Sequence, residues 1–447
     1  MFMCKGLKPY SIVEELGFKY LLYILEPRYV IPSRTTFARN IIPEMYQSLR
    51  RKLQLKLSDV KSELESVSIA IDIWTSRAQD PFIAFNLQYV SPEFNMESYT
   101  LDLEPFSGHH TAEAICKKLD EKLEDIELND DDIEKFVVSD NGSNMLAALE
   151  QSSEDRRLDR EIAEILRQRK SWEHLKCFNH TAQLAITDTK RDMNMNNVID
   201  KTSRLVTRYK KSATAKEALE RYQKDLDLAP HSMLQRVKTR WNSDHIMLAR
   251  AVEQKQAIIN ECAASGESCL SASEWRLAEG FVQVLQPIAD HTDELGSQTV
   301  PTASMVLPVI CEIQAELQEF IQKAPKGTGI QFARKLLTNV ENRFFYYNSK
   351  EVYKVAMVVD PRFKTLLEHE SWFTTGKELL IDEADEKYLQ RIQKGLVQTP
   401  QDTETVGDTP ASAPEAGTKS SKWRHLVKKS VNRTSIASTS TERRNKI

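Results

Sequence analysis

Two aspartates lie at the ends of apolar segments and could do metal chemistry. Asp72 lies in a segment where Val67, Ile69, Ile71 and Ile73 alternate with other side chains, and Asp140 follows Lys135-Phe-Val-Val-Ser139. Carboxylate oxygens are the ligands that Mg²⁺ prefers, and paired cations support phosphoryl transfer. That chemistry needs further oxygen ligands, usually a third carboxylate. An aspartate followed by Asn141-Gly142 also fits a simple turn, so spacing alone leaves both interpretations open.

Cys177 and His180 are a second candidate pair, because they are three residues apart and both can bind zinc. A structural zinc site needs four ligands, and no second cysteine or histidine pair has a suitable spacing. We therefore expect no zinc in this chain. Its six cysteines are scattered, which is typical of reduced thiols in a nuclear or cytosolic protein.

Arg240 and Trp241 offer groups that can contact DNA. A guanidinium can bind phosphate through two nitrogens, and an indole can stack on an unpaired base. The alternative is a tryptophan packed inside the protein beside a solvated arginine. Further basic residues near the N-terminus could contact phosphate or form a solvated helix face: Arg50, Arg51, Lys52 and Lys56.

The bulk composition excludes several classes of function. The formal net charge is −4, so any DNA contact must come from local basic surface. The sequence has no run of about 18 apolar residues and no signal-peptide pattern, which indicates a soluble intracellular protein without a membrane partner. Phosphate-binding glycine loops, the Gly-x-Ser-x-Gly motif and the His-Glu-x-x-His motif are all missing from the sequence.

The hydrophobic pattern predicts a mixed α/β protein with additional helices. Residues 1–65 have helical periodicity with an interruption at Pro43, and strands are expected at 67–74, 82–90, 98–105, 135–139 and 174–178. Helices are expected at 111–128 and from Thr181 toward Lys211. Residues 152–170 are predicted to be helical or mobile, and five helices are predicted beyond Trp241, at 246–260, 273–296, 303–322, 329–348 and 380–394.

These elements suggest four regions. They are an N-terminal helical segment at 1–65, a ribonuclease-H-like core at 66–238, an all-α insertion domain at 239–396 and a disordered tail at 397–447. The chain order of three strands, helix, strand, helix, strand and helix underlies the second assignment.

The order of the motifs resembles that of the hAT transposase superfamily, in particular its host-adopted zinc finger BED domain-containing relatives. The resemblance covers roughly residues 5–395, and the segments that carry it are Pro9–Glu14 with Gly17-Phe18, Pro27–Tyr29, Pro32–Arg34, Asp72–Ser76, Ser139–Met145, Cys177–His180, Thr239–Ser243, Pro301–Ser304 and Asp360–Lys364.

The resemblance implies specific roles for the candidate residues. Asp72 and Asp140 occupy the places of the family's first two metal-binding acids, and Cys177 and His180 match its Cys-x-x-His element near the active site. Trp241 matches an aromatic residue implicated in holding distorted DNA. The fold that the resemblance implies is a ribonuclease-H-like core interrupted by a long helical insertion.

Two departures from the family pattern bear on activity. The family's last catalytic acid lies in a Ser-Glu-Arg element of a C-terminal segment that also mediates dimerisation. Here Glu442 lies between Thr441 and Arg443 without apolar helical surroundings, and we interpret this likeness as accidental. The C-terminal dimerisation segment is expected to be missing, so the dimeric state stays open. The N-terminal BED zinc finger is also expected to be missing.

The sequence therefore favours a non-enzymatic, transposable-element-derived nuclear protein that binds DNA, partner proteins or both, with a role in transcription regulation. It would require no cofactor, although Asp72 and Asp140 could retain Mg²⁺. One alternative is an active metal-dependent transposase or nuclease completed by another carboxylate or another chain. Another is a truncated gene product with apolar core surface uncovered.

Overall fold

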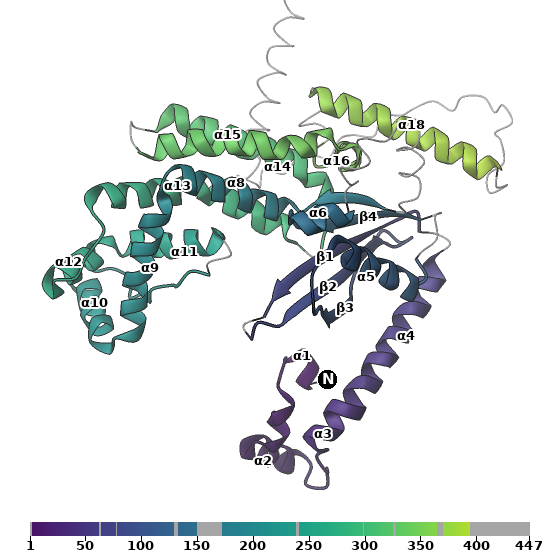
Figure 1. Cartoon of the computed structure of the whole chain (residues 1–447), viewed down its shortest axis with the longest axis horizontal. Helices are drawn as coiled ribbons and strands as arrows, with labels where there is room; N and C mark the ends of the chain where they lie inside the picture. Colours follow the sequence, from purple (N-terminus) through teal and green to yellow (C-terminus); the bar gives the residue numbers. More distant parts are fainter. Residues whose placement is uncertain are drawn as a thin grey trace, which may run out of the picture. The chain divides into compact units, whose positions relative to one another are not determined.

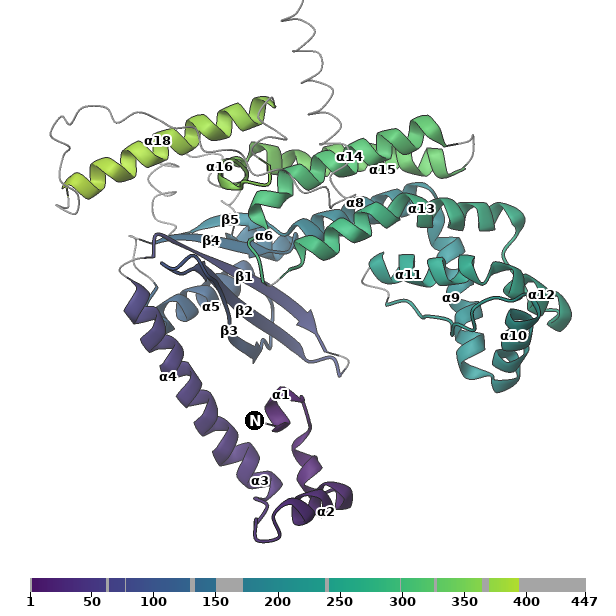
Figure 2. The same ribbon diagram turned by 180° about the vertical axis from the view of Figure 1, so that it is seen from behind.

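The computed structural model divides the chain into two compact units, Met1–Leu175 and Lys176–Ile447. It describes residues 2–61, 64–76, 78–128, 133–149, 172–237, 241–297, 299–324, 328–363 and 370–393. The predictions for 152–170, for the tail at 397–447 and for Arg240 lie outside the described residues. Figures 1 and 2 show the elements of both units, which are described separately below.

The first unit begins with the helices that the periodicity predicts. They are α1 (Phe2–Lys5), η1 (Tyr10–Glu14), α2 (Leu16–Leu25), α3 (Arg34–Thr36), η2 (Phe37–Ile41) and α4 (Ile42–Val60). The predicted interruption at Pro43 takes the form of a π-helical turn, η2, which ends at Ile41, two residues before the proline. Proline lacks an N–H and its ring crowds the carbonyl four residues earlier, so a wider turn lets the helix continue.

A five-stranded mixed sheet follows, in the order β3-β2-β1-β4-β5. Its strands are β1 (Ser66–Thr75), β2 (Pro81–Val90), β3 (Met96–Pro105), β4 (Glu134–Ser139) and β5 (Glu173–Lys176). β2 is antiparallel to both β1 and β3, whereas β1 and β4 are parallel. All five predicted strands are confirmed, although β5 ends at Lys176, before the predicted Phe178.

The sheet buries one face against helices, which produces the two-residue alternation of its sequence. Val67, Ile69 and Ile71 of β1 and Val137 of β4 belong to one core cluster with Ile115, Leu119 and Leu123 of α5 (Ala112–Asp125). Helix α6 (Ser143–Leu149) packs against α5. The predicted α/β class is confirmed, and the mixed sheet is consistent with a ribonuclease-H-like core.

The described part of the second unit consists of helices, apart from Lys176 at the end of β5. They are α8 (Phe178–Asp192), α9 (Met195–Lys211), α10 (Ala213–Asp225), α11 (Trp241–Glu253), α12 (Lys255–Ser265), α13 (Ala272–Leu295), η5 (Ala303–Met305), α14 (Val306–Lys323), α15 (Thr328–Ser349), α16 (Glu351–Val359) and α18 (Ser371–Gln393). The expected helical character beyond Trp241 is confirmed.

Two predicted helices prove to be helix pairs. The predicted helix from Thr181 toward Lys211 breaks at Asn194, whose φ of 53° lies in the left-handed region. Asparagine tolerates this conformation better than most residues, so neither Gly nor Pro marks the break. The predicted helix at 246–260 breaks at Gln254, which ends α11 and precedes α12. These two predictions were wrong in continuity but not in helical type.

The compact units do not coincide with the domains expected at 66–238 and 239–396, and those boundaries stay predictions. No helix among the described residues is long and apolar enough to cross a lipid bilayer.

Candidate functional site

The sheet of the first unit brings Asp72 and Asp140 to the same level of two neighbouring strands. Ala70 of β1 pairs with Val138 of the parallel strand β4. Each aspartate lies two residues further along its strand direction, and Asp140 immediately follows the last residue of β4. Neighbouring strands are about 4.8 Å apart, so the two residues are adjacent across the sheet. Asp72 is exposed and Asp140 is half-buried.

Asp140 also has a local structural role. Its Oδ1 accepts a hydrogen bond from the backbone N–H of Gly142 at 2.9 Å. A Cβ at position 142 would lie 3.0 Å from the same oxygen, so the tight approach suits glycine. The turn leads directly into α6, which begins at Ser143. The turn interpretation therefore holds for Asp140, and one of its oxygens is already engaged.

The end of β4 is fixed to the next strand by a buried polar contact. Ser139 Oγ lies 2.8 Å from Nε2 of His174 in β5, and it is also 3.0 Å from the carbonyl oxygen of Asp140, to which it donates. Both side chains are buried. This contact holds the backbone that carries Asp140 and limits how far the carboxylate can move relative to the sheet.

No third ligand group accompanies the two aspartates within the described ranges. In that part of the chain, no cluster of three or more His, Cys, Asp or Glu side chains could hold a metal ion. Two carboxylates without a third carboxylate can attract one hydrated cation, whereas two-metal catalysis needs both ions held in fixed positions.

Cys177 and His180, predicted as a pair, meet at the N-terminus of α8 in the second unit. Cys177 is the N-cap residue of this 15-residue helix and is partly buried, and His180 is exposed in its first turn. Burial opposes ionisation of the thiol. This effect of burial is outweighed by the side chain of His180, through its hydrogen bond and its charge, and by hydrogen bonds from the backbone amides of His180 and Asn179. Together these interactions lower the pKa of Cys177.

Aromatic packing holds this helix end in place. Phe178 packs on Phe344 and Tyr347 of α15, with ring centroids 4.9 and 5.8 Å apart. The Tyr347 hydroxyl donates to Thr181 Oγ1 at 2.8 Å, and Thr181 donates in turn to the carbonyl oxygen of Cys177 at 3.1 Å. The cysteine is therefore presented by a rigid, anchored turn.

We expect Cys177 to react with iodoacetamide at lower pH than an ordinary cysteine, because the thiolate is the reacting species. Replacement His180→Gln removes the positive charge, so the midpoint of the pH profile should rise. Peptide-resolved mass spectrometry measures the pH midpoint of Cys177 alkylation in the wild-type chain and in His180→Gln. Cys262 is an internal reference, since burial raises its pKa to about 12. An unchanged midpoint in His180→Gln would rule out this role for the histidine.

Trp241, expected to stack on a DNA base, is instead packed within its own unit. It is the first residue of α11, and only 5% of it is exposed. Its backbone N–H donates to Gln183 Oε1 at 2.8 Å, and its ring lies 6.4 Å from that of His245. In this conformation the indole is not available to a base, so the packing alternative describes its present position. The adjacent Arg240 lies outside the described residues.

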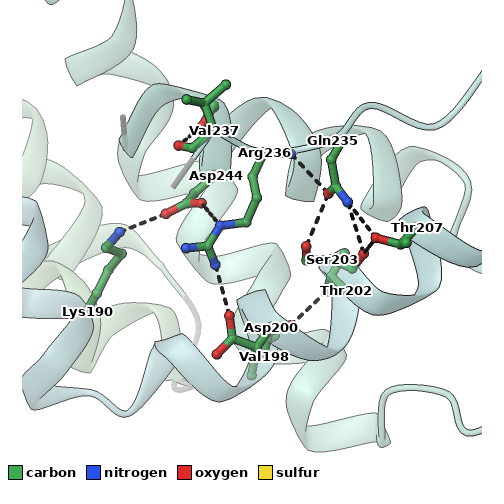
Figure 3. Close-up of polar contacts among 11 residues, drawn as sticks. Lys190, Val198, Asp200, Thr202, Ser203, Thr207, Gln235, Arg236, Val237 and Asp244 are labelled. Carbon is green, nitrogen blue, oxygen red and sulfur yellow. Dashed lines mark hydrogen bonds and ion pairs between the residues drawn. The ribbon is translucent and has the colours of Figure 1, made fainter. Parts of the chain in front are cut away.

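An ion cluster of Lys190 in α8, Asp200 in α9, Asp244 in α11 and Arg236 has a buried centre and holds Arg236 against these helices (Figure 3). Asp244 is 1% exposed, and its Oδ2 accepts a hydrogen bond from Lys190 Nζ at 2.7 Å. Its Oδ1 lies 3.1 Å from Arg236 Nε, close enough for an ion pair without hydrogen-bond alignment. Arg236 NH1 also contacts the exposed Asp200 at 3.1 Å.

Uncharged contacts extend this anchoring to the residues beside Arg236. Gln235 Nε2 donates to Thr207 Oγ1 at 2.6 Å, and Ser203 Oγ donates to Gln235 Oε1 at 3.1 Å (Figure 3). Ser243 Oγ donates to the carbonyl oxygen of Val237 and accepts from its N–H, both at 2.8 Å. Sequence reasoning missed the ion cluster, because Lys190 and Asp244 are 54 positions apart.

Comparison with known proteins relates these features to one group. A family model described as the ZBED1 RNase-like helical domain matches residues 175–284. The human zinc finger BED domain-containing protein 4 is 25% identical over 393 residues, which is 85% of this chain and 31% of that protein. The putative AC transposase of Zea mays is 23% identical, covering 80% of this chain and 43% of the transposase.

This chain is similar to hAT transposases and to BED-type zinc finger proteins. A putative transcriptional regulator, tpeD, of Talaromyces stipitatus is also similar, with 24% identity over 70% of this chain and 39% of that protein. The chain thus spans less than half the length of these three curated relatives.

The segment matched by the family model contains most of the features described in the second unit. Cys177, His180, Trp241 and the whole ion cluster lie within residues 175–284, whereas Asp72 and Asp140 lie before it. The resemblance expected from the order of the motifs is confirmed. The roles of the individual residues in DNA or metal binding stay predictions.

Proposed function

We propose that this chain is a host-adopted, catalytically inactive relative of the hAT transposases that binds DNA in the nucleus and acts in transcription regulation, alone or with partner proteins. The observation that carries the proposal is the aspartate pair, Asp72 within β1 and Asp140 directly after β4, with no third Asp, Glu, His or Cys grouped with them among the described residues. The names of the relatives, which include a putative transcriptional regulator, support the regulatory class.

Loss of catalysis follows from electrostatics. Phosphoryl transfer requires fixed positive charge beside the attacking and leaving oxygens. A pair of carboxylates, one of them already engaged with the Gly142 N–H, holds a cation weakly and in no fixed geometry. The scaffold would therefore keep its shape and its surface while losing strand cleavage.

The N-terminal region supplies the local basic surface that DNA binding requires. Residues 1–60 contain ten Lys or Arg and five Asp or Glu, whereas the whole chain has a formal net charge of −4. Of the four basic residues expected on α4, Arg50 pairs with Asp125 at 2.8 Å and Lys56 with Glu97 at 3.0 Å. Arg51 and Lys52 are exposed and are therefore the better phosphate contacts.

Titration of duplex DNA at several salt concentrations tests this surface. Each phosphate contact contributes about 0.9 to the slope of log affinity against log salt concentration. We expect Arg51→Ala/Lys52→Ala to weaken binding of all sequences and to reduce the slope by about two. The variant Lys210→Ala/Lys211→Ala removes two exposed charges from the end of α9 and is the matched control. Equal losses of DNA affinity in both double variants would show that Arg51 and Lys52 of α4 do not form the contact surface.

An active nuclease is the second candidate, and the preserved adjacency of Asp72 and Asp140 favours it. In that case another carboxylate or a partner chain would complete the site. Under either proposal, Mg²⁺ is the cation that these oxygens would hold, and Cys177 and His180 alone do not complete a zinc site. DNA contacts of Arg240, Trp241, Cys177 and His180 remain part of the proposal, and Trp241 would have to leave its packed position to stack on a base.

A further inference from the structure

An open groove of about 580 Å³ lies between α5 and α6 of the first unit. Its floor consists of small side chains from both helices, namely Ala112, Cys116, Ala147 and Ala148. Larger apolar side chains of the same helices, such as Ile115 and Met145, belong instead to the core cluster of the sheet. Small side chains let another helix come close, because the distance between packed helices depends on the side chains at the contact.

A hydrogen bond across the floor holds the two helices together. Cys116 Sγ donates to the carbonyl oxygen of Ala148 at 3.0 Å. Ala148 is also part of the core cluster, so α6 is fixed from below. The groove is therefore formed before a partner arrives, and binding does not require the helices to rearrange.

The groove has an acidic rim along α5, formed by Glu113, Asp120 and Glu124. All three are exposed, and their spacing of seven and four positions brings them to one side of the helix. Lys117 also borders the groove, but its Nζ lies 3.9 Å from Glu121 Oε1, so these two charges offset each other. The three carboxylates of the acidic rim therefore determine the charge that a partner meets.

Two carboxylates of the acidic rim have no cationic partner within their part of the chain. Neither Asp120 nor Glu124 forms an ion pair with any residue that the structure describes. Neighbouring atoms also remove part of the hydration of Asp120, which raises the pKa of its carboxyl. A cation beside Asp120 would replace the lost hydration. Complementary charge of this kind selects a positively charged partner.

These features narrow the class of partner. Acidic side chains repel the phosphates of nucleic acid and anionic lipid, and pairing of this face with itself would oppose like charges. An amphipathic helix with basic residues beside a small apolar face fits both the floor and the acidic rim. Because a helix rises 1.5 Å per residue, Glu113 and Glu124 are about 16 Å apart along α5, which accommodates roughly three turns of a partner helix.

We propose that the groove between α5 and α6 binds a basic amphipathic helix of a partner protein. Lysine or arginine side chains of that helix pair with Glu113, Asp120 and Glu124, and its apolar side lies on the alanine floor. This assignment goes beyond the proposed function and is independent of the aspartate pair and of the basic surface on α4.

Fluorescence anisotropy of a labelled synthetic peptide tests the role of the acidic rim. The probe has about 18 residues of Lys, Leu and Ala, arranged so that the lysines follow one side of a helix. It is titrated with the whole chain at low salt, where ion pairs are least screened. We expect saturable binding that Asp120→Lys/Glu124→Lys weakens roughly tenfold or more, because two attractions become repulsions. Glu217→Lys/Asp225→Lys, which reverses two exposed acids of α10, is the matched control and should leave the affinity unchanged.

Filling the groove tests the role of the floor without a change of charge. Ala147 is exposed, so Ala147→Trp should leave the fold intact and weaken the peptide roughly tenfold by occupying its place. Ala263→Trp changes an exposed alanine of α12 and is the matched control. Circular dichroism of each variant confirms that it is folded.

Four results would overturn the proposal. The first is a wild-type chain that does not bind the peptide, and the second is an equal loss of affinity in Glu217→Lys/Asp225→Lys, which would show attraction to net charge alone. The third is equal binding of a peptide of the same composition with its lysines spread around the helix. The fourth is a dimer of the wild-type chain in sedimentation equilibrium that Ala147→Trp abolishes, because a second copy would then occupy the groove.

Discussion

Supercoiled plasmid DNA incubated with this protein and Mg²⁺ or Mn²⁺ is expected to stay uncut. Asp72 of β1 and Asp140, directly after β4, each lie two residues beyond the paired residues Ala70 and Val138, but no third Asp, Glu, His or Cys is grouped with them in the described residues. Removing one ligand from a two-metal site dismantles the charge stabilisation on which phosphoryl transfer depends, so cleavage should be lower than that of an active relative by several orders of magnitude.

Matched variants make this result informative. Asp72→Ala and Asp140→Ala should both give the same background as the wild-type chain in a gel assay of nicked and linear plasmid. Binding of the plasmid, followed in parallel, should persist in both variants, which shows that the substrate was engaged. Metal-dependent nicking that Asp72→Ala abolishes would contradict the account and would favour the active-nuclease alternative.

Replacement Asp244→Ala is expected to produce the largest loss of stability, about 3–5 kcal/mol in the free energy of unfolding. Asp244 is 1% exposed and balances Lys190, which is 7% exposed, together with Arg236. Its removal would leave the buried ammonium of Lys190 uncompensated. Urea denaturation followed by circular dichroism measures the effect, and Asp244→Asn is a milder variant if the alanine variant does not fold.

Asp200→Ala is the matched control for Asp244. Asp200 also contacts Arg236, but 62% of its side chain is exposed. Ion pairs in water contribute little, so the loss should stay within about 1 kcal/mol. Similar losses in Asp200→Ala and Asp244→Ala would show that burial of the cluster has no special energetic role. We also expect the Asp244 variants to increase proteolysis around Arg236, which the cluster anchors.

The sheet could be predicted from sequence because its chemistry is local. Val67, Ile69 and Ile71 alternate in the sequence as they do on the buried face of β1. Strand order and strand direction also follow from the crossover through α5, which returns the chain parallel to β1. The placement of Asp72 and Asp140 on neighbouring parallel strands could therefore be predicted, whereas the hydrogen bond from the Gly142 N–H to Asp140 required coordinates.

Features that depend on distant partners could not be predicted. No residue near Lys190 in the sequence indicates that it pairs with Asp244, 54 positions later. The helix break at Asn194 also has no Gly or Pro to mark it. For Trp241, the sequence could not distinguish a packed indole from one that is free to stack on a base. The exposed fraction of 5% shows that the indole is packed. The pair of Cys177 and His180 was predictable, because three positions correspond to nearly one helical turn.

Titration with Mn²⁺, followed by the electron paramagnetic resonance of the free ion, tests whether Asp72 and Asp140 hold a catalytic pair of metal ions. It counts the ions that the two aspartates hold without requiring a substrate. The account predicts at most one weakly bound ion per chain, removed equally by Asp72→Ala and Asp140→Ala. Two tightly bound ions in the wild-type chain would contradict it, because they would require a further ligand beside these strand ends.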